Sequence, residues 1–129
     1  MPQPPPSPSE TPLGTAIPCD RDILDMEPMF RNFGGPGPTV TMLYGLFLEN
    51  ADELSRVLKD RLAFGDLDGV RLAAHSAAGA ARTAGAGRLA DLFGSVEEAA
   101  LRGDAAVARR EAAALDRALA DVKILIARI

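Results

Sequence analysis

The chain has 129 residues, enough for one compact domain, and its 47% apolar but only 5% aromatic composition favours packed helices over a β-sandwich. A formal net charge of −4 argues against general nucleic-acid binding, which needs a basic face. The single cysteine, Cys19, excludes an internal disulfide and a cysteine-based zinc site, and it fits a reducing compartment.

The first 18 residues differ in composition from the rest, because six of the first twelve are Pro. Such a segment neither builds a helix nor buries apolar surface. We interpret residues 1–18 as a Pro-rich linker or mobile arm, and residues 19–129 as a helical bundle. No basic region followed by an apolar stretch opens the chain, and no run of 18 apolar residues occurs. We therefore expect no membrane association and a cytoplasmic location.

Apolar residues recur at helical spacing along the remainder of the chain. Residues 20–33 contain Pro28, which favours two short turns over one helix. Thr39 is expected to cap a long helix that Gly65 ends, and Asp66 can cap the next one. Further helices are predicted over residues 67–83, 87–102 and 105–128.

Short connections force neighbouring helices to run antiparallel. The predicted fold is therefore all-α, an antiparallel up-down four-helix bundle with an extra short N-terminal helical element. The sequence offers no strand candidate and no internal repeat.

His75 is the only histidine, and it falls in the middle of the predicted helix 67–83. On a helical wheel, the apolar side of this helix lies opposite His75. We therefore expect the imidazole to point into solvent. The apolar side is formed by Val70, Ala73, Ala74, Ala77, Ala81 and Ala84.

Several residues share the exposed face of His75. Gly79 lies one turn beyond His75. A glycine within an exposed helix lowers its stability by about 1 kcal/mol relative to alanine. We therefore interpret Gly79 as leaving room for a partner to come close to the helix. Arg71 and Arg82 form a basic strip, and Leu72 is a candidate rim of a docking patch. An ordinary solvated helix face is the alternative explanation for the charges.

At this point the sequence resembles a known family. Residues 74–79, Ala-His-Ser-Ala-Ala-Gly, followed by Arg-Thr-Ala-Gly at 82–85, are similar to the phosphoacceptor helix of histidine phosphotransfer (HPt) domains. The resemblance extends over about residues 20–128. One position departs from the family pattern, since Ala78 stands where the family commonly has a lysine. Arg82 or Arg71 can supply that positive charge, or Arg56 or Lys59 from the preceding helix.

The resemblance implies that His75 is the catalytic residue of a phosphorelay. It would accept a phosphoryl group from the aspartate of a response-regulator receiver domain and pass it to another receiver. A sensor histidine kinase, simple or hybrid, would stand upstream, and Mg²⁺ is expected on the receiver rather than on this chain. The residues expected to contact the phosphoryl group or the receiver are Arg71, Leu72, Ser76, Gly79 and Arg82.

The same resemblance implies a phosphorelay intermediate rather than a free-standing enzyme. No autokinase activity is expected, because the family's ATP-binding motifs are absent, and we expect a monomer without a cofactor. Two alternatives remain open: a degenerate HPt-like module that docks a receiver or kinase without being phosphorylated, and a helical dimerisation or adaptor domain. The apolar end of the chain, residues 124–129, is the feature that favours dimerisation.

Overall fold

The computed structural model describes residues 20–129, so the predicted arm at residues 1–18 and Cys19 lie outside the described residues. Within the described part, all regular elements are helices. They are α1 (Asp20–Ile23), α2 (Glu27–Phe33), α3 (Pro38–Phe64), α4 (Leu67–Ala84), α5 (Gly87–Leu101), α6 (Ala105–Ala113) and α7 (Leu115–Ala127).

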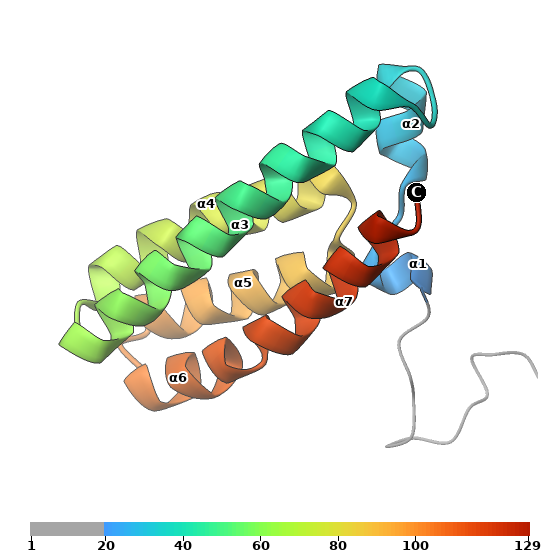
Figure 1. Ribbon diagram of the computed structural model, residues 1–129. Coiled ribbons are helices and arrows are strands. Elements are labelled where there is room, and N and C mark those ends of the chain that lie inside the picture. Colours follow the sequence, from blue (N-terminus) through green and yellow to red (C-terminus); the bar gives the residue numbers. More distant parts are fainter. Residues whose placement is uncertain (1–19) are drawn as a thin grey trace, which may run out of the picture.

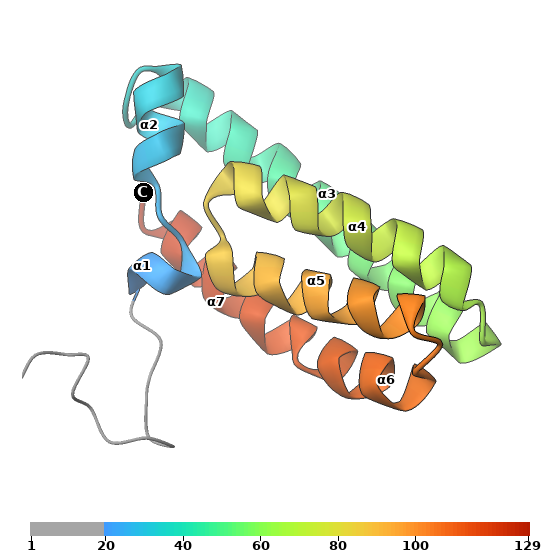
Figure 2. The same cartoon turned by 180° about the vertical axis from the view of Figure 1, so that it is seen from behind.

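The long helices form the predicted up-down bundle. Helices α3, α4 and α5 run antiparallel in turn, and α6 and α7 together take the fourth place (Figure 1). The short α1 and α2 lie at the end of the bundle where the C-terminus also lies, as Figure 2 shows from behind. The all-α fold with a short N-terminal helical element is thus confirmed.

Two predicted helix boundaries are wrong. Helix α3 is not capped by Thr39 but begins at Pro38, after Gly37, with no side-chain cap. Proline suits the first turn because its φ is fixed at a helical value and because an N–H at this position would have no partner within the helix. The predicted last helix is interrupted at Ala114, whose N–H bonds to the Glu111 carbonyl three residues back at 3.1 Å. Neither Pro nor Gly marks this tightened turn, so the sequence gives no sign of it.

Helix α4 packs between α3 and α5 (Figure 2). Its buried residues are one valine and six alanines, so most of its contribution to the core is small side chains. Small residues allow the neighbouring helices to come close, while large residues from those helices fill the interior. The fully buried large residues include Tyr44, Leu58, Leu89, Phe93 and Leu115. The buried residues of α4 are Val70, Ala73, Ala74, Ala77, Ala78, Ala81 and Ala84.

The turn between α4 and α5 is fixed by a close backbone contact with the N-terminal segment. Gly85 has a φ of +84°, and its carbonyl accepts a hydrogen bond from the Asp25 N–H at 2.8 Å. A Cβ at this position would lie 2.0 Å from the Asp25 carbonyl oxygen. Only glycine fits here, because both the φ angle and the available space exclude a side chain.

Candidate functional site

His75 lies in the middle of α4, a helix with well-defined ends. At the N-terminus, the Asp66 carboxylate accepts a hydrogen bond from the Gly69 N–H at 3.0 Å. At the C-terminus, Gly85 closes the helix in a left-handed conformation. The His75 side chain is 72% exposed, in agreement with the helical wheel. A partner can therefore reach the imidazole, which is held on a rigid helix.

Within residues 20–129, the imidazole has one close polar partner, the side chain of Glu97 on α5. Nδ1 of His75 lies 2.8 Å from Oε2 of Glu97, whose side chain is only 23% exposed. A carboxylate can only accept a hydrogen bond, so Nδ1 carries the hydrogen and donates it. In the neutral ring, the lone pair is then on Nε2. The contact selects the tautomer in which Nε2 is the nucleophilic nitrogen.

Sequence reasoning missed Glu97. The signal that the sequence offers is the spacing of Glu97, which follows the buried Phe93 by four residues and precedes the buried Ala100 by three. This spacing places Glu97 next to the apolar side of α5. An acidic residue at the margin of an apolar stripe is unusual, since Glu is rarely buried. The residue that it faces on α4 depends on the register between the two helices, and no sequence pattern gives that register.

The opposite side of His75 is bounded by a shallow groove between α3 and α4. Leu72 and Ser76, both predicted site residues, lie in this groove, and Leu72 is 54% exposed. The groove has a volume of about 480 Å³, and its α3 side is formed by Leu54, Val57 and Arg61. His75 thus lies between a partly apolar groove on the α3 side and the Glu97 carboxylate on the α5 side.

The two predicted cations on α4 differ in their surroundings. The Arg71 guanidinium donates to the Asp68 carboxylate at 2.9 Å, and its side chain is only 32% exposed. Arg82 is exposed, and no carboxylate within residues 20–129 lies within ion-pair distance of it. The predicted basic strip is therefore partly neutralised at Arg71 and remains available at Arg82.

The cations of α3 are engaged elsewhere. Arg56 pairs with Glu53 and Asp60 on its own helix, and its hydrogen bond lowers the pKa of the Glu53 carboxyl. Lys59 pairs with Asp116 at the start of α7. The structure therefore directs both cations to other carboxylates and brings neither of them to His75.

Two small residues of α4 follow His75 and have different surroundings. Ala78 is fully buried and adds no functional group to the surface. Gly79 is exposed, and a Cβ built there would meet no atom within 4 Å. Packing among residues 20–129 therefore does not require a glycine at position 79. The Thr83 hydroxyl donates a hydrogen bond to the Gly79 carbonyl, four residues back along α4, at 3.1 Å.

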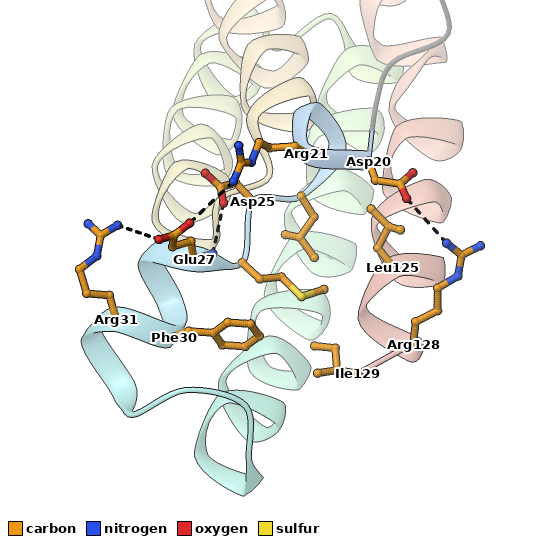
Figure 3. Close-up of a pocket in the computed structure, with 11 residues that line it drawn as sticks. Asp20, Arg21, Asp25, Glu27, Phe30, Arg31, Leu125, Arg128 and Ile129 are labelled. Atoms are coloured by element: carbon orange, nitrogen blue, oxygen red, sulfur yellow. Dashed lines mark hydrogen bonds and ion pairs between the residues drawn. The ribbon is translucent and has the colours of Figure 1, made fainter.

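A larger hollow of about 910 Å³ lies between α1, α2 and the end of α7 (Figure 3). Ion pairs border it, with Asp20 3.9 Å from Arg128, and Glu27 3.7 Å from Arg21 and 3.6 Å from Arg31. Its apolar lining consists of Leu24, Met26, Phe30, Leu125 and Ile129. No residue of α4 or α5 lines this hollow, so it is separate from His75.

Residues 20–129 contain no cluster of three or more His, Cys, Asp or Glu side chains arranged to hold a metal ion. In the same part of the chain, no helix has the length and apolarity that crossing a membrane requires.

An antiparallel helical bundle with a single exposed histidine on a central helix fits the phosphotransfer bundles that the sequence resembles. Comparison with protein families gives a match of residues 42–124 to the Hpt domain. The match covers most of the chain, from the first turns of α3 to α7, and includes both His75 and Glu97. The chain therefore belongs to the Hpt domain family, whose members act in phosphorelays with receiver domains and kinases. No curated protein and no solved structure gives a significant match.

Proposed function

We propose that this domain is a phosphorelay intermediate in which Nε2 of His75 carries the phosphoryl group. The observation that carries the proposal is the contact between His75 and Glu97. It leaves an exposed imidazole with Nδ1 hydrogen-bonded at 2.8 Å and Nε2 free to act as a nucleophile. Phosphoryl transfer depends mainly on position and charge compensation, so an exposed, oriented imidazole meets the main requirement.

The chemistry follows from this tautomer. The Nε2 lone pair attacks the phosphorus of a receiver's aspartyl phosphate, and an N–P bond forms. The P–O bond to the aspartate breaks, and its electron pair returns to the aspartate carboxylate. The ring now holds the phosphoryl group on Nε2 and a hydrogen on Nδ1, so it gains positive charge. The Glu97 carboxylate stabilises this charge. When the next receiver's aspartate attacks the phosphorus, a new P–O bond forms and the N–P bond breaks. Its electron pair returns to Nε2, so the ring leaves as neutral imidazole with the hydrogen still on Nδ1.

The receiver is proposed to dock on the face of α4 that carries Leu72, Ser76 and Gly79. The groove beside Leu72 offers apolar surface, and Gly79 lets a partner backbone come close to the helix. Arg71 and Arg82 flank this face, and the receiver is expected to bring its own Mg²⁺. A cytoplasmic location and an upstream sensor histidine kinase are parts of the same proposal.

The proposal is tested by incubating the chain with a panel of phosphorylated receiver domains. We expect the wild-type chain to gain an acid-labile, base-stable label and the His75→Ala variant to gain none. Because His75 is the only histidine, any N-phosphohistidine must be at this position. The absence of label from every receiver would refute phosphotransfer.

One observation favours a second candidate, a docking module that binds a receiver without being phosphorylated. The fully buried Ala78 leaves this part of α4 without a cation. Such a module would bind a phosphorylated receiver and keep its affinity after His75→Ala, yet it would take up no label. Measuring binding and transfer on the same receiver separates the two candidates.

A further inference from the structure

The hollow between α1, α2 and the end of α7 keeps apolar surface that the described residues do not cover. Leu24 and Leu125 form its buried floor. Met26 and Phe30 are only half-buried, and Ile129 is 44% exposed. Figure 3 shows the Phe30, Leu125 and Ile129 side chains grouped inside a border of charged ones. With a volume of about 910 Å³, the hollow is large enough to hold several apolar side chains of a ligand.

The charges around this hollow balance one another. Its lining contains three arginines and three carboxylates. Each of the arginines lies 3.6–3.9 Å from a carboxylate of the lining. The Asp25 carboxylate accepts a hydrogen bond from the Glu27 N–H at 3.2 Å. A charged ligand would meet no net opposite charge here, and its burial would cost desolvation free energy. The hollow therefore suits an uncharged, apolar occupant.

The chain contains a segment of this chemistry immediately before α1. Residues 11–18, Thr-Pro-Leu-Gly-Thr-Ala-Ile-Pro, have no charged side chain and carry the large apolar residues Leu13 and Ile17. Pro12 and Pro18 restrict the backbone in advance, which reduces the entropy lost on docking. Pro-rich segments bind as extended peptides in apolar grooves that contain aromatic side chains. The arginines at the border can also donate hydrogen bonds to the carbonyls of such a peptide.

The segment is also close enough along the chain to reach the hollow. Asp20 lines the hollow, and it follows Ile17 by three residues and Leu13 by seven. An extended chain covers at most about 3.6 Å per residue, so Leu13 can lie anywhere within about 25 Å of Asp20. A segment joined by so short a connection has an effective concentration in the millimolar range. This advantage favours it over a free ligand of similar affinity.

We propose that residues 11–18 dock in this hollow of the same chain, with Leu13 and Ile17 against Met26, Phe30 and Ile129. The docked segment covers the exposed apolar surface and holds α1 and α2 against the end of α7. The inference is independent of the proposed phosphotransfer, because no residue of α4 or α5 lines the hollow.

The test is NMR spectroscopy of the full chain, with nuclear Overhauser effects between assigned methyl and aromatic protons. We expect cross-peaks from the Leu13 and Ile17 methyl groups to the Met26 methyl group and the Phe30 ring. The double variant Leu13→Asp, Ile17→Asp places two carboxylates in the segment, so docking should be lost. The Met26 methyl and Phe30 ring signals should then shift.

The matched control is the double variant Ser7→Asp, Ser9→Asp. It adds the same two charges to the same part of the chain, but outside the proposed docking segment. We expect it to keep the wild-type cross-peaks and the wild-type Met26 and Phe30 signals. Neither double variant changes a residue of a described helix, so both are expected to fold.

Two results would overturn the inference. One is the absence of these cross-peaks in the wild-type chain, with Met26 and Phe30 signals that do not change in the variant at Leu13 and Ile17. The other comes from a mixture of isotope-labelled and unlabelled chains. Cross-peaks seen only between the two kinds of chain would show that the segment of a second copy fills the hollow. Neither result bears on the phosphorylation of His75, so the proposed function is tested separately.

Discussion

Replacement of Glu97 by alanine removes the hydrogen bond and the negative charge beside Nδ1 of His75. A hydrogen bond to a charged group contributes about 1.5–3 kcal/mol. The imidazole is 72% exposed, so solvent screening reduces the effect to about 1 kcal/mol. This free energy corresponds to about a fivefold change in an equilibrium constant or a rate. We therefore expect the population ratio of the Nδ1–H to the Nε2–H tautomer of His75 to fall about fivefold. Phosphoryl transfer should slow by a similar factor.

The tautomer ratio is measured by ¹⁵N NMR of the imidazole, and the transfer rate with a phosphorylated receiver. Glu98→Ala is the matched control, because Glu98 is the next residue of α5 and pairs with Arg102 rather than with His75. Glu97→Gln keeps an acceptor oxygen without the charge and separates the two contributions. An unchanged tautomer ratio together with an unchanged rate in Glu97→Ala would refute the role assigned to this contact.

Three further predictions concern docking and stability. Gly79→Trp should abolish receiver binding in a titration while keeping the helical circular dichroism, whereas Gly45→Trp, also at an open helix position, should bind normally. Gly85→Ala should lower the free energy of unfolding by about 2 kcal/mol or more in urea, because alanine disfavours the +84° φ and its Cβ would overlap the Asp25 carbonyl. The Tyr44 hydroxyl is buried without a partner in the described structure, so Tyr44→Phe should stabilise the fold by about 1 kcal/mol. Burial, and secondly the negative charge of Asp25, raises the pKa of the Tyr44 phenol in the folded protein. Above about pH 10 the phenol ionises in the unfolded chain but not in the folded one, so the free energy of unfolding of the wild type should fall there. Urea titrations of Tyr44→Phe should not show this fall.

Much of the fold follows from local signals that a sequence displays directly. The Gly-Asp pairs at 65–66 and 103–104 each lie between two helices, and both aspartates accept a capping hydrogen bond from a backbone N–H of the next helix. The turn at Ala114 escaped prediction because no residue type marks it. The start of α3 at Pro38 was missed because Thr39 is also a good cap in isolation.

The candidate site was only partly predictable. The exposure of His75 follows from the period of a single helix, which the alanines of α4 make plain. The contact with Glu97 depends on how α4 and α5 are aligned. That alignment results from the packing of small side chains along the whole interface. No spacing within either helix encodes it, so this contact needed the structure.

The most direct test of the central claim is to locate the phosphoryl group after exchange with a phosphorylated receiver. Combined ³¹P and ¹⁵N NMR distinguishes phosphoryl groups on Nε2, on Nδ1 and on oxygen. We predict one phosphoryl group on Nε2 of His75, with Nδ1 still protonated and hydrogen-bonded to Glu97. A phosphoryl group at any other atom, or none while the phosphorylated receiver is bound, would contradict the proposed role of His75.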